Sequence, residues 1–339
     1  MLHNNYVRPH LNKRKGTESD SHPLFGGKEM KGFATDNKHP QGIVGVRRPY
    51  KVFRLYHHSK SRLWKMLYNE PFFHDYLEHR RIREVYELAD KAARRPCLVK
   101  VSNSGWATKS QLVDDEYQSL TYQLDKIDSV TGVELQGGVH HSLHWSRRYE
   151  YPYAIKAVMS VAKQVVTPRV LDCGAGLGPI QFFLASKGFD VYSMDTYLAG
   201  LELSAQKGLE NGLINIQWSY GNVLRIPFPD EYFDVVQCIS VLEHVVEGIE
   251  GNTDVILKGV IDEMLRVLRP KGSAILTFDV NLNSKSERRL YYREYESLCR
   301  VLGIQATEPP ADKLFSSDSA EGRIMGDDLA VFCATFTHT

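Results

Sequence analysis

Three alternating glycines follow an apolar run and give the chain its most specific chemical signal. Gly174, Gly176 and Gly178 come directly after residues 170–173, which have the composition of a buried strand. A side chain at such positions would block the positive φ angles of a tight turn or the close approach of the backbone to a ligand. Pro179 then suits the first turn of a helix. The sequence therefore predicts a strand, a ligand-binding loop and a helix, in this order.

The spacing of these glycines restricts the ligand. The dinucleotide fingerprint G-x-G-x-x-G would need a glycine where Pro179 stands, which argues against NAD and FAD. A second apolar strand over residues 190–194 ends in Asp195, about 20 residues beyond the loop. A carboxylate there can accept bonds from both hydroxyls of a ribose that has no 2′-phosphate.

The segments that follow alternate between strand-like and helix-like patterns. Residues 216–221, 233–240 and 273–280 have strand composition, with helical stretches between them. Such alternation is typical of a parallel sheet with helices on both faces.

In this order, the motifs VLDCGAGLG (170–178), FDVVQCISVLEHV (233–245) and LRPKGSAILTF (268–278) resemble class I S-adenosylmethionine-dependent methyltransferases. The resemblance covers about residues 151–339. It implies an α/β fold with a doubly wound, seven-stranded, mostly parallel sheet and an antiparallel last strand. Residues 329–336 are the candidate for that last strand, and residues 304–307 are expected to pair with it.

The resemblance implies S-adenosylmethionine as the cofactor, with the glycine loop around its methionine part. Asn222 stands where the family commonly has an acidic residue, but its amide oxygen can still accept a bond from the adenine amino group. For Asp172, an alternative role in stabilising the turn stays open. The predicted cofactor-binding residues are Asp172, Gly174, Ala175, Gly176, Gly178, Asp195, Thr196, Gly221, Asn222, Val223, Ile239, Ser240, Tyr149 and Tyr151.

The predicted catalytic residues are His244 and Glu243, which follow the fourth strand at the edge where ligands bind. Imidazole can accept a proton from a hydroxyl, and a carboxylate can orient it; the alternative is a histidine that only packs after the strand. The resemblance also implies that no metal is needed, because metal-dependent members of the family place an aspartate cluster after the fourth strand and this chain has Leu242, Glu243 and His244 there. A zinc site from His140, His141 and His144 also lacks a fourth ligand with recognisable spacing.

Composition restricts the partners and the compartment. The 339 residues include 42 Lys and Arg against 41 Asp and Glu, so the net charge of +1 gives no general attraction to nucleic acid. The five cysteines form no C-x-x-C pair, which is typical of reduced thiols. With no apolar N-terminal signal and no long apolar run, we expect a cytoplasmic protein without a membrane segment.

Three regions are predicted along the chain: a flexible segment over 1–50, a helical accessory or lid region over 51–150, and a methyltransferase domain over 151–339. Residues 72–95 have a helical pattern. A second helix is predicted from apolar residues at steps of three and four, namely Val113, Tyr117, Leu120, Leu124 and Ile127.

The favoured function is metal-independent methyl transfer to a hydroxyl or amine of a small molecule, such as a sugar or a secondary metabolite. One alternative is an RNA or protein methyltransferase that uses the helical region for recognition, suggested by the arginines at 80, 81, 83, 94 and 95. Another is a methyltransferase-like binding module without activity. The acceptor atom and the oligomeric state are not predicted, because one scaffold supports many acceptors.

Overall fold

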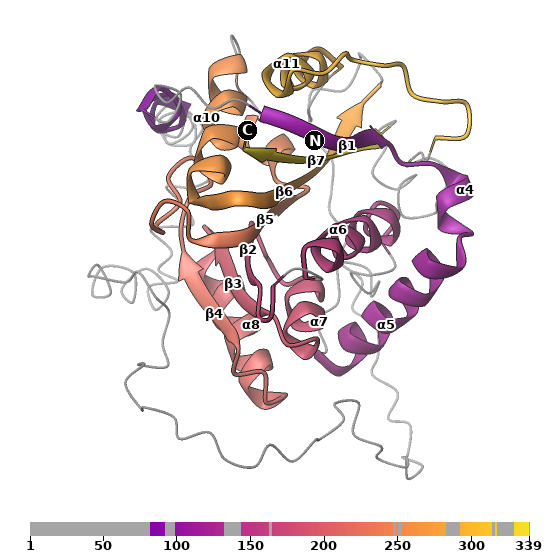
Figure 1. The fold of residues 1–339 in the computed structure, drawn as a ribbon, viewed down its shortest axis with the longest axis vertical. Helices are drawn as coiled ribbons and strands as arrows, with labels where there is room; N and C mark the ends of the chain where they lie inside the picture. The colour runs from indigo at the N-terminus through magenta and orange to yellow at the C-terminus, as the bar shows by residue number, and fades with distance from the viewer. Residues whose placement is uncertain are drawn as a thin grey trace, which may run out of the picture. The chain divides into compact units, whose positions relative to one another are not determined.

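The computed structural model describes residues 82–91, 99–131, 144–162, 165–246, 249, 253–282, 292–313, 316 and 329–338. The predicted flexible segment 1–50 and the cluster of arginines, apart from Arg83, lie outside these residues. The described part is built on a seven-stranded sheet with the order β1-β7-β6-β5-β2-β3-β4 (Figure 1).

The strands are β1 (Val99–Trp106), β2 (Arg169–Cys173), β3 (Asp190–Asp195), β4 (Ile216–Tyr220), β5 (Phe233–Ile239), β6 (Leu268–Asn281) and β7 (Leu329–His338). The helices are α4 (Lys109–Leu112), α5 (Asp115–Thr131), α6 (Arg147–Ala162), α7 (Ile180–Ser186), α8 (Leu198–Glu210), α9 (Leu242–Val246), α10 (Asp254–Val267) and α11 (Tyr292–Leu302). One more helix spans residues 82–91.

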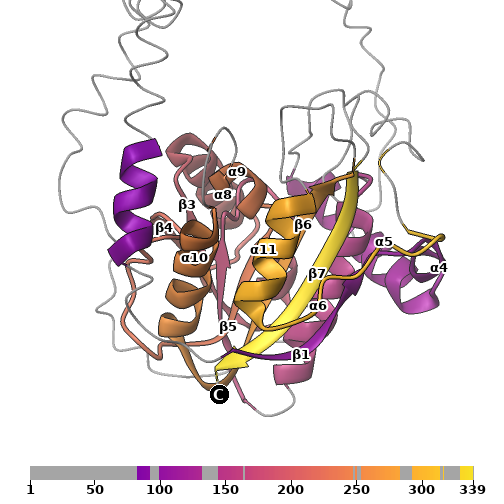
Figure 2. The same ribbon diagram turned by 90° about the horizontal axis from the view of Figure 1, so that it is seen from above.

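The sheet has the predicted doubly wound form. Strands β4, β3, β2, β5 and β6 are parallel, and β7 is antiparallel to its neighbour β6, as predicted. Helix α6 lies on one side of the sheet, and α10 and α11 lie on the other (Figure 2). Helix α7 lies beside α6 (Figure 1). All seven residues of β5 are buried, because both faces of this central strand are covered.

The strand order reverses between β2 and β5, and this reversal positions the site. From β2 the chain moves outward through β3 to β4, and it then returns to β5 and moves the other way through β6. Ligands of open α/β sheets bind beyond the carboxyl ends of the strands at such a point. The glycine loop after β2 and the segment after β5 therefore meet at the place where a ligand is expected.

The edge of the sheet differs from the prediction. Residues 304–307 form no strand; β1 pairs antiparallel with β7 instead, with Val101 opposite Phe336. The region over 51–150, predicted as a helical accessory or lid region, thus also contains the strand Val99–Trp106. The physical reason is that the apolar strand β7 needs hydrogen-bond partners on both sides, and β1 supplies one side.

The predicted helix before the methyltransferase motifs is α5, with one correction. Tyr117 and Leu124 are buried on the expected face. Val113 is 70% exposed and lies before the helix begins, because α4 ends at Leu112 and α5 starts at Asp115. No helix within the described ranges is long and apolar enough to cross a bilayer.

Candidate active site

The glycine loop is held against the ends of two other strands. Gly174 has φ +73°, and a Cβ added there would lie 2.3 Å from Cγ2 of Val241, which follows β5. The backbone N–H of Gly174 donates to the carbonyl of Met194 at 2.7 Å. Any side chain at Gly174 would therefore be strained and would collide with the segment after β5.

Two adjoining cavities flank this loop and share Gly174. The smaller has a volume of about 100 Å³ and the larger about 350 Å³. Of the predicted residues, the smaller cavity is lined by Tyr151, Asp172, Gly174, Ala175, Gly176, Gly178, Ile239 and Ser240. The larger is lined by Gly174, Asp195, Thr196, Gly221, Asn222, Val223 and His244. Nearly the whole predicted set thus lies around one crevice.

Asp172 presents a buried carboxyl group to the smaller cavity. It is 2% exposed, and its Oδ2 accepts no hydrogen bond from the described residues. Burial raises the pKa of this carboxyl to about 7. A positively charged group in the cavity would supply the missing partner and favour the ionised form.

Arg147 lines the same cavity from the first turn of α6. Its guanidinium forms an ion pair with Glu150 and donates to Oγ of Ser240. The carboxylate of Glu150 is fully buried and also accepts bonds from Ser240 at 2.9 Å and from Thr277 at 2.5 Å. Burial opposes the charge of Glu150, but Arg147 and the two hydroxyls hold its pKa below the ordinary range. This network fixes the guanidinium beside the glycine loop.

The network also holds an unusual backbone conformation. Ser240 has φ +49°, in the left-handed region that a residue with a side chain seldom adopts. Its N–H donates to the carbonyl of Thr277 at 2.9 Å. Neither Glu150 nor Thr277 was predicted from the sequence; the one available signal was the spacing of three residues between Arg147 and Glu150, which places them on one helix face.

The two predicted catalytic residues point in different directions from α9. Glu243 is 2% exposed, and its Oε2 has no hydrogen-bond partner among the described residues. Burial, followed by the neighbouring charge of Glu150, raises the pKa of Glu243 to about 7. His244 is exposed and lies in the wall of the larger cavity. A ligand there can reach His244, whereas Glu243 lies beside the buried network.

The polar residues of the larger cavity already make local hydrogen bonds. Oδ2 of Asp195 accepts the N–H of Gly176 at 2.9 Å, and Oδ1 accepts that of Tyr197 at 2.8 Å. Oδ1 of Asn222 accepts the N–H of Leu224 at 2.9 Å. Each oxygen keeps one further lone pair for a ligand. The predicted acceptor atom of Asn222 is therefore partly used by its own turn.

Tyr149 does not belong to this crevice, which corrects the prediction. Tyr151 contacts the glycine loop, since a Cβ on Gly178 would lie 2.5 Å from its Oη. Tyr149 lines a separate cavity together with Tyr153. Two positions along a helix correspond to a rotation of about 200°, so Tyr149 and Tyr151 must face nearly opposite sides of α6.

Within the described ranges, no group of three or more His, Cys, Asp or Glu side chains is arranged to hold a metal ion. His140 and His141 lie outside those ranges. The four described cysteines, Cys173, Cys238, Cys299 and Cys333, are buried free thiols.

Together, the two cavities fit a ligand that has a zwitterionic end and a nucleoside end. The smaller cavity offers a carboxyl group on Asp172 and a guanidinium on Arg147, which match an ammonium and a carboxylate. The larger offers Asp195, Asn222 and an apolar wall that includes Val85 from the helix over 82–91.

Comparison with known proteins agrees with this geometry. A family model described as a methyltransferase domain matches residues 171–276. The ubiquinone/menaquinone biosynthesis C-methyltransferase UbiE of Stutzerimonas stutzeri is 26% identical over 225 residues, which is 65% of this chain and 75% of that protein. The ubiquinone biosynthesis O-methyltransferase of Rickettsia felis is 27% identical over 135 residues, 40% of this chain and 51% of that protein.

Among solved structures, the YcgJ protein of Bacillus subtilis aligns with a TM-score of 0.39 and 16% identity, covering 55% of this chain and 99% of that one. The seven-stranded sheet and the matched methyltransferase domain support the resemblance to class I S-adenosylmethionine-dependent methyltransferases. The chain is an S-adenosylmethionine-dependent methyltransferase, with S-adenosylmethionine as cofactor and a methyl acceptor as second substrate.

Proposed function

We propose that the enzyme methylates a hydroxyl or amine of a small molecule without a metal ion. The observation that supports this most is the two-part crevice at the strand reversal. There, Asp172 and Arg147 would hold the amino and carboxylate groups of the cofactor, and Asp195 and Asn222 would hold its ribose and adenine. In α9 only Glu243 is acidic, which supports a reaction that needs no metal.

Bound S-adenosylmethionine supplies an electrophilic methyl group on a sulfonium centre. The chain has to hold the acceptor in line with that centre and exclude water. Val241 and Gly174 lie in contact where the two cavities join, so the acceptor is expected to approach past the segment after β5. Positioning, rather than covalent catalysis, is the main task of this site.

His244 is the proposed proton acceptor for the substrate hydroxyl. It shares the wall of the larger cavity with Gly174 and Val241, next to that junction. Glu243 has a different role in this proposal. When Glu243 is protonated, Glu150 carries the one negative charge beside Arg147. A second negative charge there would repel the cofactor carboxylate, so the neutral form of Glu243 lets the guanidinium bind it.

A phenolic hydroxyl is the favoured acceptor within this class. Two relatives are named as a C-methyltransferase and an O-methyltransferase of quinone biosynthesis. Their names support a phenol, because the reduced form of a quinone is an aromatic ring that carries hydroxyl groups. The near-neutral charge of the chain supports a small molecule over nucleic acid, and we propose that the enzyme acts in the cytoplasm.

The proposal is tested by incubating the protein with S-adenosylmethionine and a panel of catechols, hydroquinones and arylamines, with formation of S-adenosylhomocysteine as the readout. We expect turnover with at least one phenol. His244→Asn should lower kcat by about 100-fold or more, the usual contribution of a general base, and leave the KM for the cofactor unchanged. Turnover with none of these acceptors would contradict the proposed function. Turnover only with amines would contradict the favoured phenol, and an unchanged kcat in His244→Asn would contradict the role of His244.

A further inference from the structure

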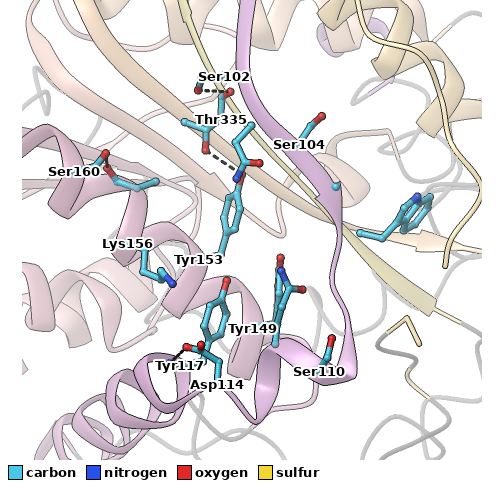
Figure 3. A pocket seen from close by; sticks show the side chains of 15 residues that line it. Ser102, Ser104, Ser110, Asp114, Tyr117, Tyr149, Tyr153, Lys156, Ser160 and Thr335 are labelled. Carbon is cyan, nitrogen blue, oxygen red and sulfur yellow. Dashed lines mark hydrogen bonds between the residues drawn. The ribbon is translucent and has the colours of Figure 1, made fainter. Parts of the chain in front are cut away.

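A second, larger cavity lies on the opposite side of α6 from the cofactor crevice. Its volume is about 580 Å³, against about 350 Å³ for the larger part of the crevice. It lies between β1, one residue of β7, and helices α4, α5 and α6 (Figure 3). A volume of this size is within the range of small-molecule sites.

The lining of this second cavity is rich in groups that form hydrogen bonds. Of its 15 residues, Gly105 and Ala157 have no polar side chain. The indole N–H of Trp106 is not directed to the cavity, because it donates to the carbonyl of Thr307 at 3.0 Å. The others are Ser102, Asn103, Ser104, Ser110, Gln111, Asp114, Tyr117, Tyr149, Tyr153, Lys156, Ser160 and Thr335. Such a lining suits a ligand that carries many hydroxyl groups rather than an apolar one.

Three tyrosines make one wall, and hydrogen bonds hold the hydroxyl of Tyr153 in place. The rings of Tyr117 and Tyr149 lie 5.4 Å apart, and those of Tyr149 and Tyr153 lie 6.0 Å apart in a stacked arrangement. Oη of Tyr153 bonds Oγ1 of Thr335 at 3.0 Å and accepts a bond from Asn103 at 3.5 Å (Figure 3). Burial raises the pKa of all three tyrosines, so their hydroxyls stay neutral near pH 7.

The two charged groups of the lining are engaged with the protein itself. Lys156 pairs with Glu116 at 2.7 Å and lies over the ring of Tyr117. Oδ1 of Asp114 accepts the N–H groups of Glu116 and Tyr117 at the start of α5. The cavity therefore offers neither a strong anion site nor a strong cation site.

We propose that this second cavity binds an uncharged, polyhydroxylated ring, with the chemistry of a mono- or disaccharide. Neutral hydroxyl and amide groups supply its polar contacts, and the tyrosine wall supplies apolar area. The first two turns of α6 separate it from the glycine loop, since Arg147 and Tyr151 face the crevice whereas Tyr149 and Tyr153 face this cavity. The bound ring is therefore a second ligand and not the methyl acceptor.

Gly105 offers a direct way to fill the cavity. It belongs to the lining, and a Cβ added to it would meet no atom within 4 Å. Gly105→Val should therefore occupy the cavity with a residue that strands favour. Lys100→Val is the matched control, because Lys100 is exposed on the same strand outside the lining. Tyr153→Phe is a second variant that removes one hydroxyl and keeps the ring.

The test is saturation-transfer NMR on the full chain with D-glucose, D-mannose, sucrose and trehalose, each at about 10 mM, which detects millimolar binders. We expect transfer to at least one sugar in the parent protein and in Lys100→Val, and a loss of affinity of about tenfold or more in Gly105→Val and Tyr153→Phe. Circular dichroism verifies that each variant is folded. If Gly105→Val is unfolded, the binding measured with Tyr153→Phe tests the proposal. Absence of transfer from all four sugars, its persistence in both folded variants, or its loss on adding S-adenosylhomocysteine would overturn the proposal.

Discussion

At the scale of single residues, the candidate site is marked by two buried acids, each with one carboxyl oxygen that accepts no hydrogen bond from the described residues. Asp172 and Glu243 are each 2% exposed, and burial raises the pKa of both to about 7. A buried carboxylate whose hydrogen bonds are incomplete destabilises the fold, so its presence beside the glycine loop points to a ligand rather than to stability. Glu150 shows the contrast, because Arg147 and two hydroxyls satisfy it.

Glu243→Gln should change how the free energy of unfolding depends on pH. The folded pKa of about 7 lies above the ordinary value of 4.5, so the two proteins should be equally stable below about pH 4.5. As pH rises from about 4.5 to about 7 the parent loses stability that the variant keeps, by on the order of 3 kcal/mol. Urea unfolding at pH 5 and pH 8 measures this, with Glu202→Gln on the exposed face of α8 as control. The same difference at both pH values would contradict it.

The residues that sequence reasoning found were those with a local signal. The glycine spacing and the strand-end position of Asp195 depend on neighbours in the chain, and the structure brings both to one crevice. Glu150 and Thr277 are 127 positions apart and meet only in the folded protein. Tyr149 was misplaced because composition does not say which face of a helix meets the cofactor.

At the scale of elements, β1 is the feature that the motifs did not reveal. Its residues Ser102, Asn103 and Ser104 are exposed and lack the apolar alternation of a half-buried strand. This segment forms a strand because it pairs with β7, which lies more than 200 positions later in the chain. Strands β2 to β6 could be predicted because each carries its own apolar run. We propose that the catalytic domain includes β1 and so begins well before residue 151.

Trp106→Ala tests whether β1 is part of the core. Trp106 packs on Tyr295 and Phe332 with ring centroids 4.8 and 5.3 Å away. Its indole N–H also donates to Thr307. We expect a loss of about 3–5 kcal/mol in the free energy of unfolding, typical of a buried tryptophan truncated to alanine. Val113→Ala, at a position that is 70% exposed, should change it by less than about 0.5 kcal/mol. Equal effects would show that β1 is only loosely attached.

At the scale of the whole molecule, the crevice joins segments that are distant in the chain. Val85 from the helix over 82–91, Arg147 from α6, the glycine loop and His244 from α9 all line it. The overall α/β plan was predictable because the order of motifs fixes the strand order. The helix over 82–91 was predicted as a helix, but its contact with the crevice was not, since no local pattern encodes that contact.

Because the ligand would contact so many segments, it should stabilise the whole fold. S-adenosylhomocysteine at 100 times its Kd is expected to raise the free energy of unfolding by about 2.7 kcal/mol. Urea unfolding with and without the ligand measures this, and Gly174→Val, in which the added Cβ would collide with Val241, should show no ligand effect. A parent protein that gains no stability would argue against an assembled site.

The most direct test of the proposed cofactor position is isothermal titration of S-adenosylhomocysteine into the parent protein and into Asp172→Asn. We expect binding by the parent with release of a proton near pH 7, because the ligand ammonium draws Asp172 into its ionised form. Asp172→Asn should bind about tenfold to 100-fold more weakly, the scale of a lost charge-assisted hydrogen bond, and release no proton from this position. No binding by the parent at about 1 mM ligand, or the same Kd in both proteins, would contradict the placement of the cofactor in this crevice.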